Sequence, residues 1–201
     1  FQHRGVDVCE IVGTDADHAR RLLDDALERG TDALVVCGGD GVISQALVEG
    51  NTLSGNGLGG GSGINADGVQ DSVFRNNLLY DNHASGISLY RIDGGAGSTG
   101  NLVVNNTVLV AADGRWALNI RDGSTGNIVF NNIFYNAHSY RGSISVWADS
   151  LSGFNSDYNV VMERFTTNDG DSVQTLAQWR TNTGHDQHSL LALPSALFVN
   201  A

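Results

Sequence analysis

The sequence of 201 residues contains no lysine, so all 11 of its basic residues are arginine. A Schiff-base lysine, a phosphate-loop lysine and a lysine general base are therefore excluded. The chain has only two cysteines, Cys9 and Cys37, too few for a disulfide framework, and each lies in an apolar run typical of a small buried hydrophobic residue. No apolar run approaches the roughly 20 residues that a membrane-spanning helix needs, so we expect no membrane span.

Positive charge is also scarce, because 22 acidic residues stand against 11 basic ones and give a formal net charge of −11. Such a chain repels the phosphate backbone of nucleic acids, and we expect no nucleic-acid partner. The sequence opens at Phe1 without Met or a basic and apolar leader. We therefore expect a fragment or a processed product, which leaves the compartment open.

Composition changes abruptly near residue 50. Residues 1–50 contain no asparagine, whereas residues 51–201 contain 19, and such a step suggests two architectures in one chain. Apolar spacing and glycine positions in the first part predict the order strand, helix, strand, Gly-rich turn and helix over residues 6–12, 16–29, 33–37, 38–41 and 42–48.

The second part repeats itself. The segment Gly-Ser-Thr-Gly-Asn-Leu-Val-Val-Asn-Asn at residues 97–106 recurs at residues 123–132 as Gly-Ser-Thr-Gly-Asn-Ile-Val-Phe-Asn-Asn. One asparagine register runs through all the units with steps of 26, 29, 26 and 27 residues, at Asn51, Asn77, Asn106, Asn132 and Asn159. A unit of this length, with short apolar alternations and Gly or Asn at the bends, indicates one turn of a parallel β-solenoid.

Stacked turns of a solenoid lie about 4.8 Å apart, so equivalent residues form columns. Asparagines in such a column can pass amide hydrogen bonds from turn to turn, which gives the asparagine register a structural role. We expect the apolar alternation to place these residues in one core: Val73, Ile87, Leu89, Leu102, Val104, Leu118, Ile120, Ile128, Phe130, Ile144 and Val146.

Residues 48–201 resemble the end of a right-handed parallel β-helix of the pectate-lyase-like superfamily. The closing Ser156-Asp157-Tyr158-Asn159, a helix around Trp179 and the tail from His185-Asp186-Gln187-His188 to Val199 carry the resemblance. It implies a mainly β fold, with about four β-helix turns over 48–162 and a C-terminal capping helix and tail over 163–201, in which His185 and His188 are capping residues. The superfamily includes lyases, hydrolases, epimerases and inert binding spikes, and the resemblance favours a secreted or periplasmic protein.

Residues 1–47 resemble a different family, the catalytic domain of diacylglycerol and related lipid kinases. The turn Gly38, Gly39, Asp40 and Gly41 follows a predicted buried strand and matches that family's nucleotide loop, although Val42 stands where threonine is usual. The resemblance implies a short α/β (βαβα) segment with a vestigial nucleotide site and favours a cytoplasmic protein. The family's second phosphate-binding loop has no counterpart here, so we expect the segment to be a cap or the remnant of a fusion.

The candidate substrate-binding residues are Tyr90, Arg121 and Trp147. Each follows an inward apolar residue on the second strand of successive turns, which predicts one outward column. Two aromatic rings and a guanidinium suit stacking on sugar rings and pairing with a uronate carboxylate. The alternative is an exposed aromatic column that only stabilises the sheet.

The candidate catalytic residues are His83, Asp113 and His138, which the bend before that strand supplies on successive turns. A carboxylate between two imidazoles can orient a general base or hold a divalent metal, but no clear acidic cluster is present and we expect no cofactor. In a uronan lyase, His83 or His138 would be the base, Arg121 would neutralise the substrate carboxylate and Tyr90 would protonate the leaving oxygen. Separate surface histidines are the alternative.

Three functions stay open. The first is a polysaccharide lyase or glycoside hydrolase acting on a polysaccharide or oligosaccharide, among which Arg121 favours an acidic one. The second is a non-catalytic β-helix that binds glycan or serves as a scaffold. The third is a truncated lipid-kinase-like protein, which binding of a nucleotide at Gly38–Gly41 would distinguish from the other two.

Overall fold

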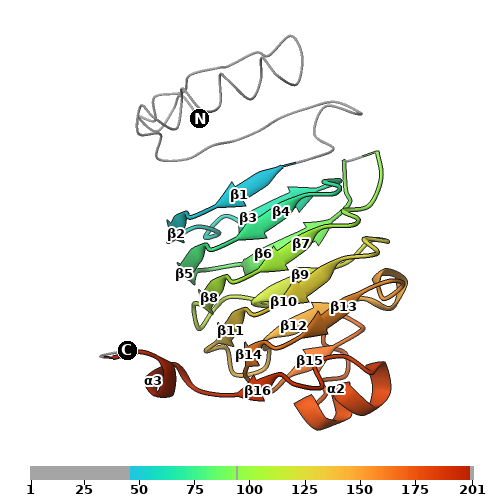
Figure 1. Cartoon of the computed structure of the whole chain (residues 1–201). Helices are drawn as coiled ribbons and strands as arrows, with labels where there is room; N and C mark the ends of the chain where they lie inside the picture. The colour runs from blue at the N-terminus through green and yellow to red at the C-terminus, as the bar shows by residue number, and fades with distance from the viewer. Residues whose placement is uncertain (1–45, 94, 200–201) are drawn as a thin grey trace, which may run out of the picture. The chain divides into compact units, whose positions relative to one another are not determined.

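The computed structural model describes residues 46–93 and 95–199, which form a stack of short parallel strands (Figure 1). Cys9, Cys37, the Gly38–Gly41 turn and nearly all of the predicted α/β segment lie outside these residues. The helix predicted over 42–48 is wrong at its end, since Leu47 and Val48 belong to a strand. Val48 pairs with Phe74 of the next turn and packs against the solenoid core.

The strands form three parallel sheets, here called sheets A, B and C. Sheet A contains β1 (Leu47–Glu49), β4 (Val73–Arg75), β7 (Leu102–Val104), β10 (Ile128–Phe130) and β13 (Asn155–Asp157). Sheet B contains β2 (Thr52–Ser54), β5 (Leu78–Asn82), β8 (Thr107–Val110), β11 (Ile133–Asn136), β14 (Val160–Val161) and β16 (Leu190–Leu191). Sheet C contains β3 (Ser62–Asp67), β6 (Ser85–Tyr90), β9 (Leu118–Ile120), β12 (Ile144–Val146) and β15 (Phe165–Thr166).

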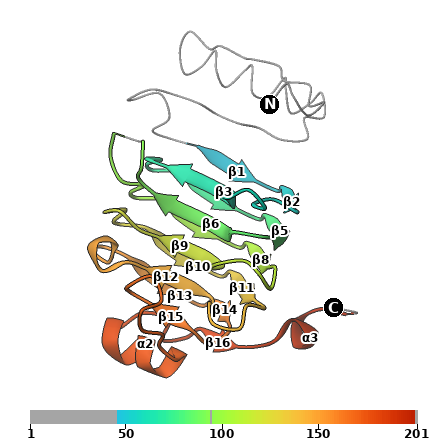
Figure 2. The same ribbon diagram turned by 180° about the vertical axis from the view of Figure 1, so that it is seen from behind.

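Each turn visits the sheets in the order A, B, C before the chain steps to the next turn (Figure 2). The described residues make five complete turns, and β16 adds one strand of a sixth. The expectation of about four turns was therefore too low. The predicted asparagine register, with Asn51 in the first turn and Asn159 in the fifth, nevertheless has one member in each of the five complete turns.

The core register was predicted correctly in sheet C and wrongly in sheet A. Every core residue predicted in sheet C is fully buried: Ile87, Leu89, Leu118, Ile120, Ile144 and Val146. In sheet A the middle residue of each three-residue strand points inward instead, as Val103 and Val129 do, while Ile128 is 41% exposed. A slip of one residue reverses the two faces of a strand. The buried Asn101 just before β7 sets the observed alternation.

The predicted asparagine register is confirmed as a ladder at the corner between sheets A and B. The Asn106 Oδ1 accepts from the Asn77 backbone N–H at 3.1 Å and from the Asn77 Nδ2 at 2.9 Å. The Asn132 Oδ1 receives the same pair of bonds from Asn106, and the Asn159 Oδ1 receives it from Asn132. Each amide therefore binds the turn on either side, which fixes the register of the stack.

A second polar ladder follows the corner between sheets C and A. The Ser72 N–H donates to Asn101 Oδ1 at 3.0 Å, and the Asn101 N–H donates to Asn127 Oδ1 at 3.0 Å. The next position is occupied by Phe154, whose ring packs edge-on against His185 with centroids 4.9 Å apart. The ladder thus ends where the C-terminal segment closes the solenoid.

The last turn is closed by α2 (Leu176–Thr183), which starts with a capping box between Thr175 and Gln178. The Trp179 ring is buried and stacks on Phe165 at 5.4 Å. The carboxyl group of Asp186, fully buried, accepts hydrogen bonds from four side chains: Trp179 Nε1, Ser156 Oγ, Asn159 Nδ2 and Ser189 Oγ. Asp186 and Ser189 together terminate the asparagine ladder, because the Asn159 Nδ2 donates to Asp186 and the Asn159 N–H donates to Ser189 Oγ. A short helix, α3 (Pro194–Leu197), follows β16.

The residue before each ladder asparagine has a left-handed backbone. Gly50, Asn76, Asn105 and Asn131 take this position in the first four turns with φ between 56° and 69°, and these residue types adopt it at little cost. The fifth turn has Tyr158 at φ 56° instead. Its ring stacks on His188 at 4.9 Å, an interaction that an asparagine could not make.

We predict that Asn106→Ala lowers the free energy of unfolding by about 2–4 kcal/mol, because it leaves buried amide and carbonyl groups of the neighbouring turns without partners. Urea unfolding followed by circular dichroism measures this change. Asn105→Gly is the matched control, since residue 105 is exposed with φ 56° and should change stability by less than about 1 kcal/mol. Equal effects of the two substitutions would contradict the ladder.

We also predict that stability falls on acidification because of His185. Burial of the imidazole beside Phe154 and Trp179 lowers the pKa of His185 below its ordinary value of 6.5, and the nearby Asp186 offsets this only in part. The unfolded chain then binds a proton that the folded chain resists, so stability is lost as the pH falls below about 6.5. Urea midpoints at pH 7.5 and 5.5 should differ less in His185→Gln than in the wild type; the same difference in both proteins would refute this role.

Candidate functional site

Three partly exposed side chains, Tyr90, Arg121 and Trp147, follow one another along the outer side of sheet C. The Arg121 N–H donates to the carbonyl of Leu89 at 3.0 Å, and the Trp147 N–H donates to the carbonyl of Ile120 at 2.9 Å. These bonds place the three residues on consecutive turns. Tyr90 is the last residue of β6, and Arg121 and Trp147 directly follow β9 and β12. We refer to Tyr90, Arg121 and Trp147 as the outer strip.

The middle of the strip is a stacked cation. The Arg121 Cζ lies 4.3 Å from the centroid of the Trp147 ring, a geometry that attracts the guanidinium to the ring face. The Arg121 Nε also donates to Asp122 Oδ2 at 2.9 Å. The guanidinium is therefore held over the indole ring, and an adjacent carboxylate compensates part of its charge.

Tyr90 lies in a negative environment. Burial of its phenol raises the pKa of Tyr90, and the carboxylates of Asp67, Asp93 and Asp122 raise it further. The phenol oxygen accepts a hydrogen bond from Asn65 Nδ2 at 2.6 Å, a bond that does not use its own O–H. Tyr90 therefore keeps its proton at neutral pH and can donate it to a ligand acceptor.

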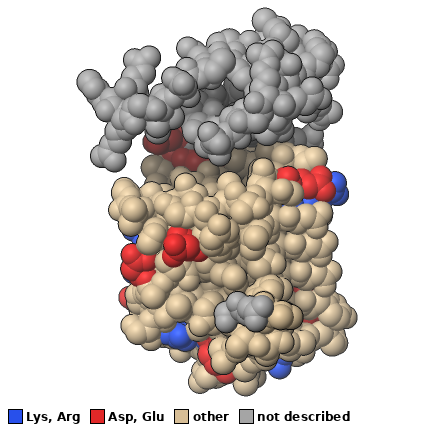
Figure 3. All heavy atoms as spheres, turned by 90° about the vertical axis from the view of Figure 1, so that its left-hand side faces the viewer, with Lys and Arg blue, Asp and Glu red and all other residues tan. Residues whose placement is uncertain are grey.

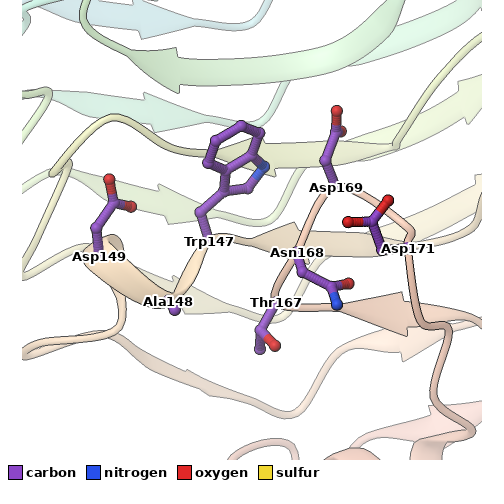
Figure 4. A pocket seen from close by; sticks show the side chains of 7 residues that line it. All are labelled: Trp147, Ala148, Asp149, Thr167, Asn168, Asp169 and Asp171. Carbon is purple, nitrogen blue, oxygen red and sulfur yellow. The ribbon is translucent and has the colours of Figure 1, made fainter.

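A shallow depression adjoins the outer strip at Trp147. It has a volume of about 550 Å³ and is lined by Trp147, Ala148, Asp149, Thr167, Asn168, Asp169 and Asp171 (Figure 4). The Asp149 carboxylate accepts from the Gly123 N–H and the Ser150 hydroxyl, at the start of the short 3-10 helix η2 (Ala148–Ser150). Figure 4 shows Asp169 across a gap from the indole of Trp147, with Asp171 beside it.

The loop that forms the far wall of this depression was not predicted from the sequence. The loop, residues 167–171, is held at its base by Thr166, whose Oγ1 donates to the carbonyl of Ser172 at 2.9 Å and accepts from the Gly170 N–H at 3.0 Å. The hydroxyl of Tyr140 donates to the carbonyl of Gly170. The Asp-Gly pair at 169–170, with both residues at positive φ, was the one available signal of a tight turn here.

Two of the three predicted catalytic residues are brought together. The His83 Nδ1 lies 2.9 and 3.0 Å from the two carboxylate oxygens of Asp113. The Nδ1 of His138 instead accepts the backbone N–H groups of Tyr140 and Arg141, at 2.9 and 3.0 Å. His138 therefore organises its own loop, while His83 and Asp113 form a dyad.

The dyad and the outer strip lie at opposite ends of sheet C. His83 comes just before β6 and Tyr90 ends it, a separation of about 20 Å at roughly 3.3 Å per residue. A lyase base and the group that neutralises the substrate carboxylate must act on one sugar residue. The structure does not bring His83 and Arg121 into such an arrangement.

The described residues, 46–93 and 95–199, contain neither a metal-binding cluster nor a membrane-spanning helix. Within these ranges no three His, Cys, Asp or Glu side chains are grouped as a metal site, and no helix there has the length and apolarity to cross a bilayer.

The face near β2, β5 and β8 carries scattered small groups of charge rather than one large patch (Figure 3). The predicted nucleotide-binding residues, Gly38, Gly39, Asp40 and Gly41, lie outside the described part.

Comparison with known families agrees with this architecture. A family model described as "Right handed beta helix region" matches residues 26–169. The chain belongs to the right-handed β-helix family. The right-handed parallel β-helix expected from the sequence is thus confirmed, and the family match itself specifies no reaction.

The expected kinase likeness is confirmed as well. Two diacylglycerol kinases of Mycobacterium tuberculosis, from strains CDC 1551 / Oshkosh and ATCC 25618 / H37Rv, are each 65% identical to this chain over 47 residues, or 23% of its length. The matched stretch spans only 15% of the length of these relatives. No solved structure matches this chain.

Proposed function

We propose that the outer strip on sheet C binds a neutral oligosaccharide. The observation that carries this proposal is the Arg121 guanidinium held 4.3 Å over the Trp147 ring, beside an open depression lined by amide, hydroxyl and carboxylate groups. Sugar rings offer apolar C–H faces to aromatic rings and hydroxyls to polar groups. A surface of this composition suits such a ligand.

The charge around the strip favours a neutral ligand over an acidic one. Asp122 neutralises part of Arg121, and Asp149, Asp169 and Asp171 line the depression. A uronate would face these carboxylates at close range, in a chain whose net charge is −11, and would be repelled. Hydroxyl groups of a neutral sugar can instead donate hydrogen bonds to the same carboxylates.

The spacing of the strip also fits an oligosaccharide. Tyr90 and Trp147 are two turns apart, which places them about 9.6 Å apart at about 4.8 Å per turn. A sugar residue covers roughly half that span, so an oligosaccharide lying along the solenoid axis can contact both rings.

The His83–Asp113 dyad supports a second candidate, a polysaccharide lyase or glycoside hydrolase. A carboxylate bonded to Nδ1 orients an imidazole and leaves Nε2 to accept a proton. The dyad would act on a sugar about 20 Å from the strip, at the other end of β6. Release of reducing ends or unsaturated sugars from a polysaccharide panel by the wild type, and not by His83→Gln, would establish this activity.

We predict that Trp147→Ala weakens binding of a neutral trisaccharide about tenfold or more, because it removes both the ring and the surface that orients Arg121. Isothermal titration calorimetry with cellotriose, maltotriose, xylotriose and mannotriose measures the loss, and trigalacturonate tests the charge preference. Tyr90→Ala should weaken binding of the same sugar.

Tyr80→Ala is the matched control for these variants, since Tyr80 is an exposed tyrosine on sheet B, 43% accessible. It should leave the affinity unchanged. Tighter binding of trigalacturonate than of every neutral sugar would contradict the proposed charge preference, and no binding of any sugar at millimolar concentration would contradict the proposed function.

A further inference from the structure

Four buried polar atoms on the sheet C side of the described residues have no hydrogen-bond partner. They are Trp116 Nε1, Asn119 Oδ1, Ser145 Oγ and Trp147 Nε1. Ser145 and Trp116 are almost fully buried as whole residues, at 0% and 1% exposure. Leaving such a group unpaired costs about 1–3 kcal/mol, so most buried polar atoms in folded proteins are paired.

These four atoms belong to neighbouring positions of the fold. Asn119 of β9 is the direct register partner of Ser145 of β12, and Trp147 follows Ser145 by two residues on the same side of the chain. Trp116 precedes β9, and its ring lies beside Gly170, where an added Cβ would come within 3.3 Å of Cζ2. The loop of residues 167–171 thus lies next to both tryptophans, at Gly170 and in the depression of Trp147.

Elsewhere the same chain satisfies comparable groups. The buried Trp179 Nε1 donates to Asp186 Oδ2 at 2.9 Å. The corner asparagines Asn106 and Asn132 use both ends of their amides. Thr166, which follows Ser145 in the outer column of sheet C, bonds the loop through its Oγ1. The unpaired atoms are concentrated in one place, and that place adjoins the outer strip.

We infer that these groups form a subsite for one ring of a neutral, hydroxyl-rich sugar, entered from the depression at Trp147 beneath residues 168–171. Two indole N–H groups donate, the Asn119 carbonyl oxygen accepts, and the Ser145 hydroxyl does both. Each sugar hydroxyl can likewise donate and accept, so it can satisfy either kind of group. This inference rests on the proposed function and adds the residues beneath the loop to the outer strip.

The surroundings of the subsite define the ligand further. Asp169 and Asp171 stand at its entrance (Figure 4), which disfavours a uronate, a sulfated sugar or a phosphate. The four atoms are covered by their neighbours, so the 168–171 segment must shift to admit a sugar. Two hydrogen bonds join this segment and Thr167 to other turns, from the Tyr140 hydroxyl to the Gly170 carbonyl and from the Ala148 N–H to the Thr167 carbonyl. The bonds among Thr166, Asn168 and Ser172 are local and would move with the segment.

Indole N–H signals in ¹⁵N-edited NMR spectra of the wild-type chain test the subsite directly. The protein has three tryptophans, and Trp179, bonded to Asp186 in the C-terminal cap, is an internal control. Titration with cellotriose, maltotriose, xylotriose or mannotriose should shift the Trp116 and Trp147 indole signals and leave Trp179 unmoved. A Trp116 indole signal that does not shift with any of these sugars at 10 mM would overturn the inference.

Calorimetry of two serine variants separates this inference from the proposed function. Ser145→Ala should weaken the neutral trisaccharide about three- to tenfold, whereas Ser88→Ala, in the same column but bonded to Ser62 Oγ at 2.8 Å, should not. Binding that depends on Tyr90 but not on Ser145, with Trp116 unshifted, would leave the outer strip standing and reject the subsite. Binding that depends on Ser145 but not on Tyr90 would support the subsite and reject the role of Tyr90 in the outer strip. No binding of any sugar would reject both proposals.

Discussion

The side-chain amide of asparagine at the corner between sheets A and B is the interaction on which the rest of the solenoid depends. Each amide joins its own turn to the turns before and after it, through bonds of 2.9 to 3.1 Å from Asn77 to Asn159. A strand of three residues is too short to hold its register by backbone bonds alone. The ladder fixes the register, and the register in turn stacks Tyr90, Arg121 and Trp147 on the outside of sheet C.

Much of the fold could be predicted because the residues that recur in each repeat, Asn and Gly, have strong local preferences for the backbone conformation of the corners. Asn and Gly mark the left-handed corners, and the ladder register from Asn51 to Asn159 is correct. The core of sheet A could not be placed from apolar residues alone, since Leu102, Val103 and Val104 are equally apolar. Only the burial of Asn101 decides between the two faces, and a polar residue is not expected inside until its ladder partner, Asn127, is known.

The outer strip could be predicted because it depends on register alone, whereas the depression beside it depends on a loop. The turn at Asp169 and Gly170 folds back toward Trp116 and Trp147 through contacts between segments distant in the sequence. The same limit applies to His138, whose spacing resembles that of His83. Its Nδ1 is used by the backbone of its own longer loop, a local detail that repeat spacing does not contain.

Hydrogen–deuterium exchange of the wild-type chain, with and without the neutral trisaccharide that binds best, tests most directly the claim that sheet C carries the binding surface. The account predicts slower exchange in the segments that hold the strip, the unpaired polar atoms and the loop, residues 85–90, 116–121, 144–149 and 166–172. Exchange in the strands of sheets A and B, such as residues 73–80 and 102–109, should stay the same. Protection confined to sheets A and B, or no protection at saturating sugar, would contradict it.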